Sequence, residues 1–253
     1  MNPGDAISLK PEHIFKIGNF DVTNSLLLSL LVVLLFLFFG LFFRKKIKII
    51  PDKLQGFFEI LIDNILNLME NVLGSRALAE KYLPYVASIF LFVITSNWLG
   101  LLPGLGVIGL KEHGLIVPFL RSPASDLNFT LALALTAVMI INVVAVRSLG
   151  LRIHLRKFFN FQNPIKFFVG ILELISEGAK IVSFSFRLFG NVFAGEVLLL
   201  VVGVLVPYLI PVPFLLMEFF VGFIQAFIFA MLTLVFIAVA IEPHGEDGKM
   251  TAR

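Results

Sequence analysis

A single arginine inside a mostly apolar stretch is the residue of this sequence that most clearly indicates a chemical function. Arg187 lies in the apolar run of residues 164–206, and Asn191 follows one helical turn later. An arginine at the centre of a membrane helix costs about 2.5–3.5 kcal/mol on insertion scales, so it normally faces protein or water and has a function. We interpret Arg187 as the centre of an ion pathway, and a purely structural ion pair inside the membrane is the alternative.

Further polar residues recur at helical spacing along the same run. Glu173, Glu177, Lys180, Arg187 and Asn191 are separated by four, three, seven and four residues. Such spacing puts all of them on one face of a helix. For the first three, an ordinary interfacial face near the adjoining loop is an equally good explanation.

Two carboxyl groups and a glutamine complete the candidate site. Glu196 lies nine residues beyond Arg187, which is about 14 Å along a helix and away from the arginine face. On the next helix, Glu218 and Gln225 are seven residues apart and share a face. Counted back from the turn between the helices, Glu196 and Glu218 have similar shallow depth, whereas Arg187 and Gln225 lie deeper. The sequence therefore predicts an outer acidic site and a central cation.

The composition indicates a membrane protein. Hydrophobic residues make up 58% of the 253 residues, 29 are phenylalanine, and the mean hydropathy is +0.98. A soluble domain of this size could not bury that much apolar surface. The net charge of +3 does not indicate nucleic-acid binding, because the basic residues sit in short loops between apolar runs. The chain has no cysteine, and its four histidines are far apart, so we expect no cofactor and no metal site.

The apolar runs predict an all-α integral membrane protein with one membrane domain and five crossing helices. We expect the crossings at residues 22–43, 84–102, 127–146, 164–206 and 213–241, with an outer segment 1–21 and an inner tail 242–253. Segment 53–73 alternates charged and apolar residues at helical spacing, which favours an amphipathic helix at the interface. The run 164–206 would be roughly 60 Å long as one helix, twice the hydrocarbon thickness. We therefore expect two long, tilted, antiparallel helices joined by a proline-rich turn.

Basic residues predict the orientation. If segment 53–73 does not cross, the basic loops 44–53 and 147–166 lie on one side together with the tail. If it crosses, the two basic loops lie on opposite sides, against the positive-inside tendency. We therefore expect the amino terminus outside and the carboxyl terminus in the cytoplasm.

Several of these residues also have structural explanations. For Gly190, Gly195 and Gly203, we expect close helix packing to be the main role of at least two. For Asn142 and Thr233, hydrogen bonding between helices is the favoured interpretation.

The motifs together resemble a known family. The segments Arg187-Leu188-Phe189-Gly190-Asn191 and Ala194-Gly195-Glu196, followed by Gln225-Ala226-Phe227-Ile228-Phe229, resemble the membrane subunit a of F-type ATP synthases. Segments 97–103, 126–130 and 173–180 resemble that family in the same order and spacing. The arginine and glutamine motifs together are highly specific.

The resemblance implies a stator subunit that carries protons to and from a rotating ring of c subunits. Arg187 would be the essential arginine, Gln225 its neighbour, and Glu196 with Glu218 part of the outer half-channel. The implied partners are the c ring, the b subunits of the peripheral stalk and the rest of the complex, in a bacterial inner membrane. The chain has no Walker A motif, so we expect no ATP chemistry in this subunit itself.

Two departures and two alternatives accompany this interpretation. Glu218 stands where many bacterial relatives have histidine, and Ile181 stands where proline is common. A secondary transporter would be expected to show internal repeats, and none is convincing. An intramembrane enzyme would need a nucleophile or metal-ligand cluster. We expect the transported ion to be H⁺, although the sequence leaves Na⁺ open.

Overall fold

The computed structural model describes residues 12–18, 20–45, 47–48, 50–102, 109–112, 115–158, 163–206 and 209–242. Most of the predicted outer segment 1–21 and all but the first residue of the predicted tail 242–253 therefore lie outside the described residues. The described chain is predominantly helical, which confirms the predicted fold class.

Within the described residues, five helices are long and apolar enough to cross a membrane. They are α1 (Asn24–Arg44), α3 (Arg76–Gly100), α4 (Leu127–Leu149), α6 (Pro164–Leu205) and α7 (Pro211–Ile241). The sequence also predicted α2 (Lys53–Leu73), but not the short α5 (Leu151–Phe158) or the 3-10 turn η2 (Pro123–Ser125). Two antiparallel hairpins were likewise not predicted, β1 (His13–Ile17) with β2 (Phe20–Thr23) and β3 (Gly109–Glu112) with β4 (Leu115–Pro118).

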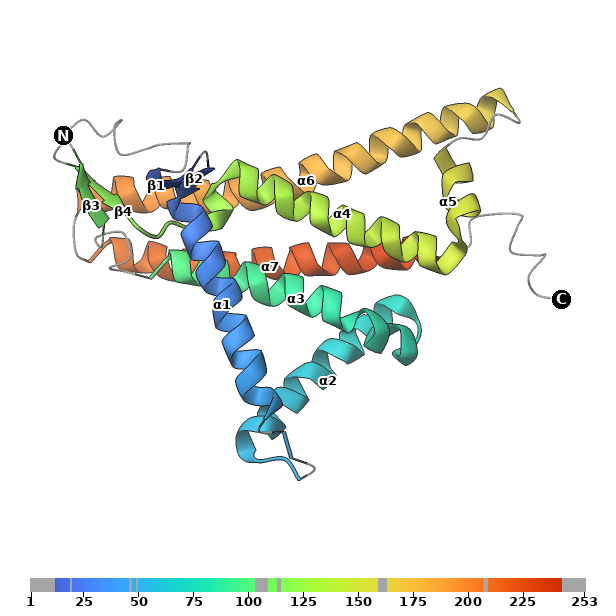
Figure 1. Ribbon diagram of the computed structural model, residues 1–253, viewed down its shortest axis with the longest axis horizontal. Coiled ribbons are helices and arrows are strands. Elements are labelled where there is room, and N and C mark those ends of the chain that lie inside the picture. Colours follow the sequence, from blue (N-terminus) through green and yellow to red (C-terminus); the bar gives the residue numbers. More distant parts are fainter. Residues whose placement is uncertain are drawn as a thin grey trace.

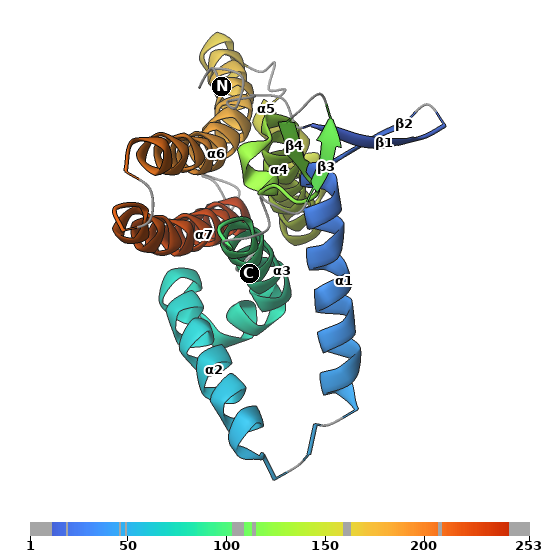
Figure 2. The same ribbon diagram turned by 90° about the vertical axis from the view of Figure 1, so that its left-hand side faces the viewer.

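The long helices form one bundle, and α1 runs across it. Helices α3, α4, α6 and α7 lie roughly along one direction, with α6 and α7 side by side and antiparallel (Figures 1 and 2). Helix α6 has 42 residues, about 63 Å at 1.5 Å per residue. Because α1 crosses this direction in both views, α1 and the long helices cannot all stand upright in one membrane, which supports steep tilting of α6 and α7.

Helix α3 begins earlier than the apolar pattern indicated. The structure starts it at Arg76 rather than at residue 84, and Pro84 lies inside it. Its first turns carry Arg76, Glu80 and Lys81, so the hydropathy signal begins only after them. The carboxyl-terminal half of α2 packs on this part of α3, where Leu66 and Met69 are buried.

Local chemistry explains several helix ends. The Thr23 side chain accepts a hydrogen bond from the backbone N–H of Leu26 at the start of α1, and Asp126 accepts one from Asn128 at the start of α4. Helix α2 ends at Gly74, whose φ of 70° is left-handed.

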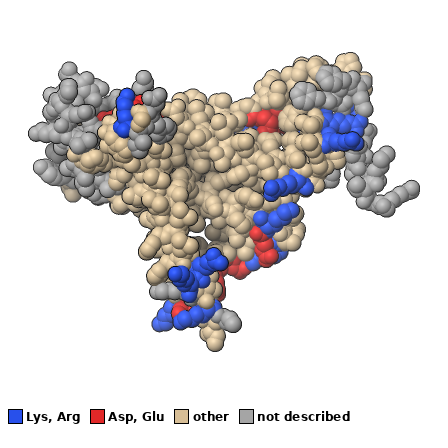
Figure 3. All heavy atoms as spheres, viewed as in Figure 1, with Lys and Arg blue, Asp and Glu red and all other residues tan. Residues whose placement is uncertain are grey.

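Charge is distributed unevenly over the surface. Figure 3 shows basic side chains gathered mainly around α5 and the connection between α1 and α2, whereas the face over the long helices is largely uncharged. Most of the large apolar side chains of α1 are exposed, Phe38 to 66%. Such a surface suits lipid or a partner subunit.

Candidate functional site

The antiparallel register of α6 and α7 brings the arginine and glutamine motifs to one level. The rings of Phe184 and Phe229 stack with centroids 4.8 Å apart. Arg187 lies three residues after Phe184, and Gln225 lies four residues before Phe229. Because the helices are antiparallel, both steps lead in the same direction along the bundle. Arg187 and Gln225 therefore lie at matching depth, although no hydrogen bond joins their described side chains.

The Arg187 guanidinium lies on a half-exposed face of α6. Its Nη2 donates a hydrogen bond to Ser183 Oγ at 3.2 Å. On the same side of the helix, Phe186 is 54% exposed and Gly190 is exposed with open space where a Cβ would lie. Among the residues that the structure describes, no carboxylate oxygen lies within 4.0 Å of the guanidinium. This permanently charged group is thus presented to whatever covers that face.

Gln225, in contrast, points into the bundle. Its side chain is 5% exposed, and its Nε2 has no hydrogen-bond partner among the described residues. A buried amide without a partner is costly unless water satisfies it. Nearby on α3, Asn97 Nδ2 donates to the carbonyl of Gly222, while Asn97 Oδ1 has no partner in the described chain either.

A small cavity, here called the Glu218 cavity, lies between α3, the loop before η2, α6 and α7. Five of its nine lining residues carry a carboxyl, amide or hydroxyl group. Its lining residues are Asn97, Gly100, Leu101, Ser122, Asn191, Val192, Glu196, Glu218 and Gly222. Three of the predicted site residues, Asn191, Glu196 and Glu218, therefore share one cavity. Asn97 Oδ1 and Ser122 Oγ, which no described group satisfies, make it a suitable place for water.

Gly195 explains how Glu218 fits. A Cβ on Gly195 would collide with the Glu218 carboxyl group. The glycine therefore lets the carboxyl lie directly against the backbone of α6. At Gly190 and Gly203, an added Cβ would meet no heavy atom within 4 Å. Within the described chain, only one of these three glycines thus has the close packing expected of at least two.

The cation of this site was not predicted from the sequence. Arg121, in the loop before η2, donates from Nε and Nη2 to Glu196 Oε2 at 3.2 and 3.0 Å. The two side chains are only 16% and 29% exposed. A signal was present in the sequence, because Arg121 is a basic residue in a loop predicted to lie opposite the two strongly basic loops.

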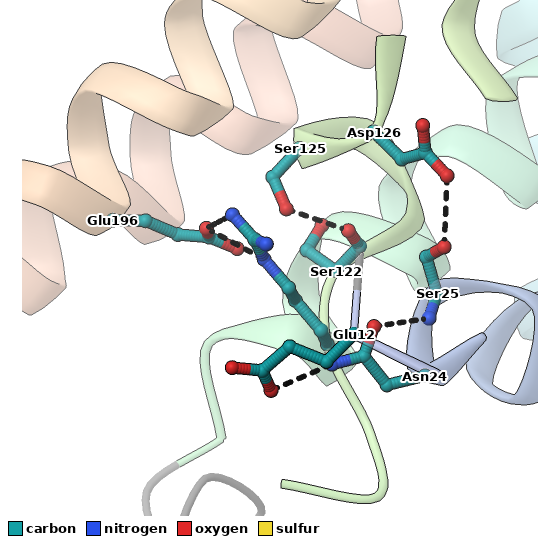
Figure 4. Close-up of polar contacts among 8 residues, drawn as sticks. Glu12, Asn24, Ser25, Ser122, Ser125, Asp126 and Glu196 are labelled. Atoms are coloured by element: carbon teal, nitrogen blue, oxygen red, sulfur yellow. Dashed lines mark hydrogen bonds and ion pairs between the residues drawn. The ribbon is translucent and has the colours of Figure 1, made fainter. Parts of the chain in front are cut away.

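A chain of polar contacts connects this loop to the start of α1 (Figure 4). Ser25 Oγ donates to Asp126 at 2.9 Å, and Ser25 N donates to Asn24 Oδ1. Asn24 Nδ2 in turn donates to Glu12 Oε2 at 3.5 Å. Burial raises the pKa of the Glu12 carboxyl, and the charge of Arg121 offsets part of that rise.

The other polar residues of α6 form a separate group, here called the Glu177 cluster. Lys180 Nζ contacts Glu177 Oε1 at 2.6 Å, and Asn142 Nδ2 donates to Glu177 Oε2 at 3.3 Å. Lys157 of α5 pairs with Glu173. The interhelical bond predicted for Asn142 is confirmed. The interhelical hydrogen bond predicted for Thr233 is wrong, because the Thr233 hydroxyl donates to the carbonyl of Phe229 in its own helix.

Comparisons with known proteins match most of the chain. A family model described as "ATP synthase A chain" matches residues 25–238. A Moorella thermoacetica protein named ATP synthase subunit a is 31% identical over 237 residues, which cover 93% of this chain and 99% of the relative. Proteins of the same name from Helicobacter pylori strain P12 and Helicobacter acinonychis are each 34% identical over 239 residues, which cover 91% of this chain and 97% of each relative.

Proposed function

Since the chain belongs to the ATP synthase A chain family, we propose that it is the stator that moves protons to and from a rotating c ring. Family membership and the five apolar helices make the chain a multi-pass membrane subunit of the ATP synthase complex. The two half-channels, the coupling to rotation and the role of each residue are parts of the proposal.

The single observation that carries the proposal is that no described carboxylate pairs with Arg187. A guanidinium within a membrane helix needs an anionic or polar partner. Its hydrogen bond to Ser183 supplies no negative charge, and the surrounding face of α6 is exposed. A carboxylate on another subunit, moving past this face, would supply the missing counter-charge. A ring of identical subunits would present such carboxylates in turn.

The positions of the Glu218 cavity and the Glu177 cluster along α6 support separate access paths. Glu196 in the Glu218 cavity is nine residues from Arg187, and Glu177 is ten residues away in the opposite direction. These separations correspond to about 14 and 15 Å along the helix. Arg187 would thus lie between an outer and an inner path.

The mechanism follows from charge. A proton from one path neutralises the ring carboxylate, which then crosses lipid as a neutral acid, and the proton leaves by the other path. Between the paths, Arg187 attracts the ionised carboxylate and repels a free proton, so that leakage is blocked and transport requires rotation. The driving energy is about 2.3 kcal/mol per charge per 100 mV.

The proposal also includes the membrane, the orientation of the chain and the neighbouring subunits. We place the chain in a bacterial inner membrane, with the amino terminus outside and the basic loops in the cytoplasm. The exposed apolar surface of α1, together with α2, is available to the b subunits of the peripheral stalk or to lipid.

Replacing Arg187 tests the proposal. In proteoliposomes containing the assembled complex, Arg187→Ala should lower proton-driven ATP synthesis by about 100-fold or more, as removal of a central electrostatic group does in enzymes. Arg187→Lys should also fail largely, because a hydrated point charge does not reproduce a guanidinium fork. Arg147→Ala, at an exposed position at the end of α4, serves as the matched control.

The same vesicles identify the ion. With Na⁺ and pH varied independently, we expect the rate to follow the pH gradient and not the Na⁺ gradient. Wild-type rates in the Arg187→Ala complex would refute the proposed role of Arg187.

A further inference from the structure

We propose that Arg121 is a positioning residue of the Glu218 cavity: it pairs with Glu196 as a fixed charge and leaves Glu218 as the carboxyl group that exchanges the proton. This inference rests on the proposed function, because it assigns separate roles to the two carboxyl groups of the outer path.

The two carboxyl groups differ in their partners. Two guanidinium nitrogens of Arg121 donate to one oxygen of Glu196, and both side chains are largely shielded from solvent. Charge-assisted hydrogen bonds of this kind are among the strongest in proteins. Removing one partner of such a shielded pair leaves an uncompensated charge. Glu196 is therefore held in place by a cation from a different segment of the chain.

Glu218 has a different environment, without such a cation among the described residues. Within that part of the chain, no lysine, arginine or histidine nitrogen lies within 4.0 Å of its carboxyl oxygens. The side chain is 7% exposed and lies against the backbone at Gly195. Because no described group of opposite charge holds Glu218 in its ionised form, it can hold a proton and release it again.

The loop that carries Arg121 is anchored at several points, as a positioning role requires. Gly100 allows Ser122 to approach α3 so closely that a Cβ there would collide with it. Ser125 Oγ donates to the carbonyl of Ser122 at 2.9 Å. On the far side, Asp126 accepts a hydrogen bond from Ser25 of α1.

Among the described residues, a second acidic group, Glu12, faces Arg121. Glu12, from the amino-terminal segment, lies close enough for the charge of Arg121 to influence its pKa. Glu12 also accepts a hydrogen bond from Asn24, which ties it to the start of α1 (Figure 4). Arg121 thus faces the acidic groups of two segments, and two of its nitrogens donate to Glu196.

In the proposed transfer, Glu218 takes up one proton from the outer side and passes one proton to the ring. A hydronium ion from the outer side gives a proton to a Glu218 carboxylate oxygen and leaves as water. The neutral acid then gives that proton to the carboxylate of the ring and returns to its ionised form. Glu196 keeps its bonds to Arg121 throughout and exchanges no proton.

A double-mutant cycle in the assembled complex tests this division of roles. The readout is the initial rate of proton-driven ATP synthesis in proteoliposomes as a function of the pH on the proton-donating side. Glu218→Gln should lower the rate by about 100-fold, the scale of a positioned proton-transfer group, and Glu196→Gln only by about threefold. Arg121→Gln should lower the rate by about tenfold and shift its pH profile, because Glu196 then loses its counter-charge.

The double substitution gives the sharpest result. Arg121→Gln with Glu196→Gln should return to the rate and pH profile of Glu196→Gln alone, because the uncompensated carboxylate is gone. Arg121→Lys should keep part of the rate. Arg152→Gln, at an exposed position on α5, is the matched control for loss of one arginine.

Two results would overturn the inference. The first is additive effects of Arg121→Gln and Glu196→Gln, and the second is a Glu196→Gln defect as large as that of Glu218→Gln. If Arg121→Gln prevents assembly, two measurements still test the inference. They are the comparison of Glu196→Gln with Glu218→Gln and the pH profile of Arg121→Lys. If Arg187→Ala loses coupling while the effects of Arg121→Gln and Glu196→Gln are additive, only this inference is refuted. If Arg187→Ala retains coupling, the proposed function is refuted.

Discussion

At the scale of single residues, Gly195 and Glu218 show how the absence of a side chain can determine a site. Glycines in membrane helices usually allow neighbouring helices to approach. Here the glycine makes room for a carboxyl group of the next helix, and Glu218 is almost fully buried against it. Gly203, two helical turns farther along α6, has no such neighbour within the described chain. The two positions therefore respond differently to the same change.

We predict that Gly195→Ala impairs the protein and Gly203→Ala does not. The new methyl group at Gly195 must displace the Glu218 carboxyl, and overpacking of this kind costs about 1–3 kcal/mol. At Gly203, alanine should be neutral or should favour the helix by up to about 1 kcal/mol. The measurements are the amount of assembled complex and its rate of ATP synthesis. Equal behaviour of the two variants would show that Gly195 does not position Glu218.

At the scale of elements, α5 is attached to α6 by charge and by close backbone contact. Lys157 of α5 pairs with Glu173 of α6. A Cβ on Gly170 would collide with the carbonyl of Phe158 at the end of α5. On α5 itself, the rings of His154 and Phe158 have centroids 5.3 Å apart. Burial is the largest cause that lowers the pKa of His154 below its ordinary value of 6.5, and the charge of Lys157 is the next. The charge of Glu177 acts in the opposite direction and raises this pKa.

This attachment predicts a pH dependence with a definite sign. Because folding lowers the pKa of His154, the folded state binds fewer protons than the unfolded state in the window below pH 6.5. The contribution of His154 to stability is therefore present above pH 6.5 and is lost as the pH falls through the lower folded value. Lys157→Gln should raise the pKa of His154, and Glu177→Gln should lower it further. Deuterium exchange at the imidazole C2 position, followed by mass spectrometry of the complex, measures both shifts, and shifts in the reverse directions would contradict the assignment.

At the scale of the whole molecule, the position of α2 determines the number of crossings. Its carboxyl-terminal half is buried against α3, whereas Glu59 in its first half is exposed. Helix α2 is not among the described helices that are apolar enough to span. If it stays on one side, the two strongly basic loops share that side. The orientation of the entire chain thus depends on one amphipathic segment.

Cysteine labelling tests this topology directly, because the chain has no cysteine of its own. With a membrane-impermeant reagent, Glu59→Cys should be labelled only from the cytoplasmic side. Lys16→Cys, at an exposed position in β1, should be labelled only from the opposite side. Labelling of Glu59→Cys from the outer side only would overturn the five-crossing topology and reverse the assignment of the two access paths.

The sequence by itself determined the features that depend on local pattern. The lengths of the apolar runs predicted all five long helices, because a membrane-spanning helix needs a nearly continuous apolar stretch. The helical period, with the turn between α6 and α7, predicted that Arg187 and Gln225 share one level and that Glu196 and Glu218 share another. The arginine motif predicted the family, which the comparisons confirm.

Only the tertiary structure decided which groups meet across long sequence separations. Arg121 and Glu196 are 75 residues apart, and Ser25 and Asp126 are 101 residues apart. No periodicity relates such residues, since their contact depends on how a loop folds over the ends of several helices. The start of α3 at Arg76 was hidden for a related reason: its charged first turns are stabilised by packing against α2, which hydropathy does not register. Local sequence thus specifies the helices, whereas the packing of the loops between them specifies the partners of the charged groups.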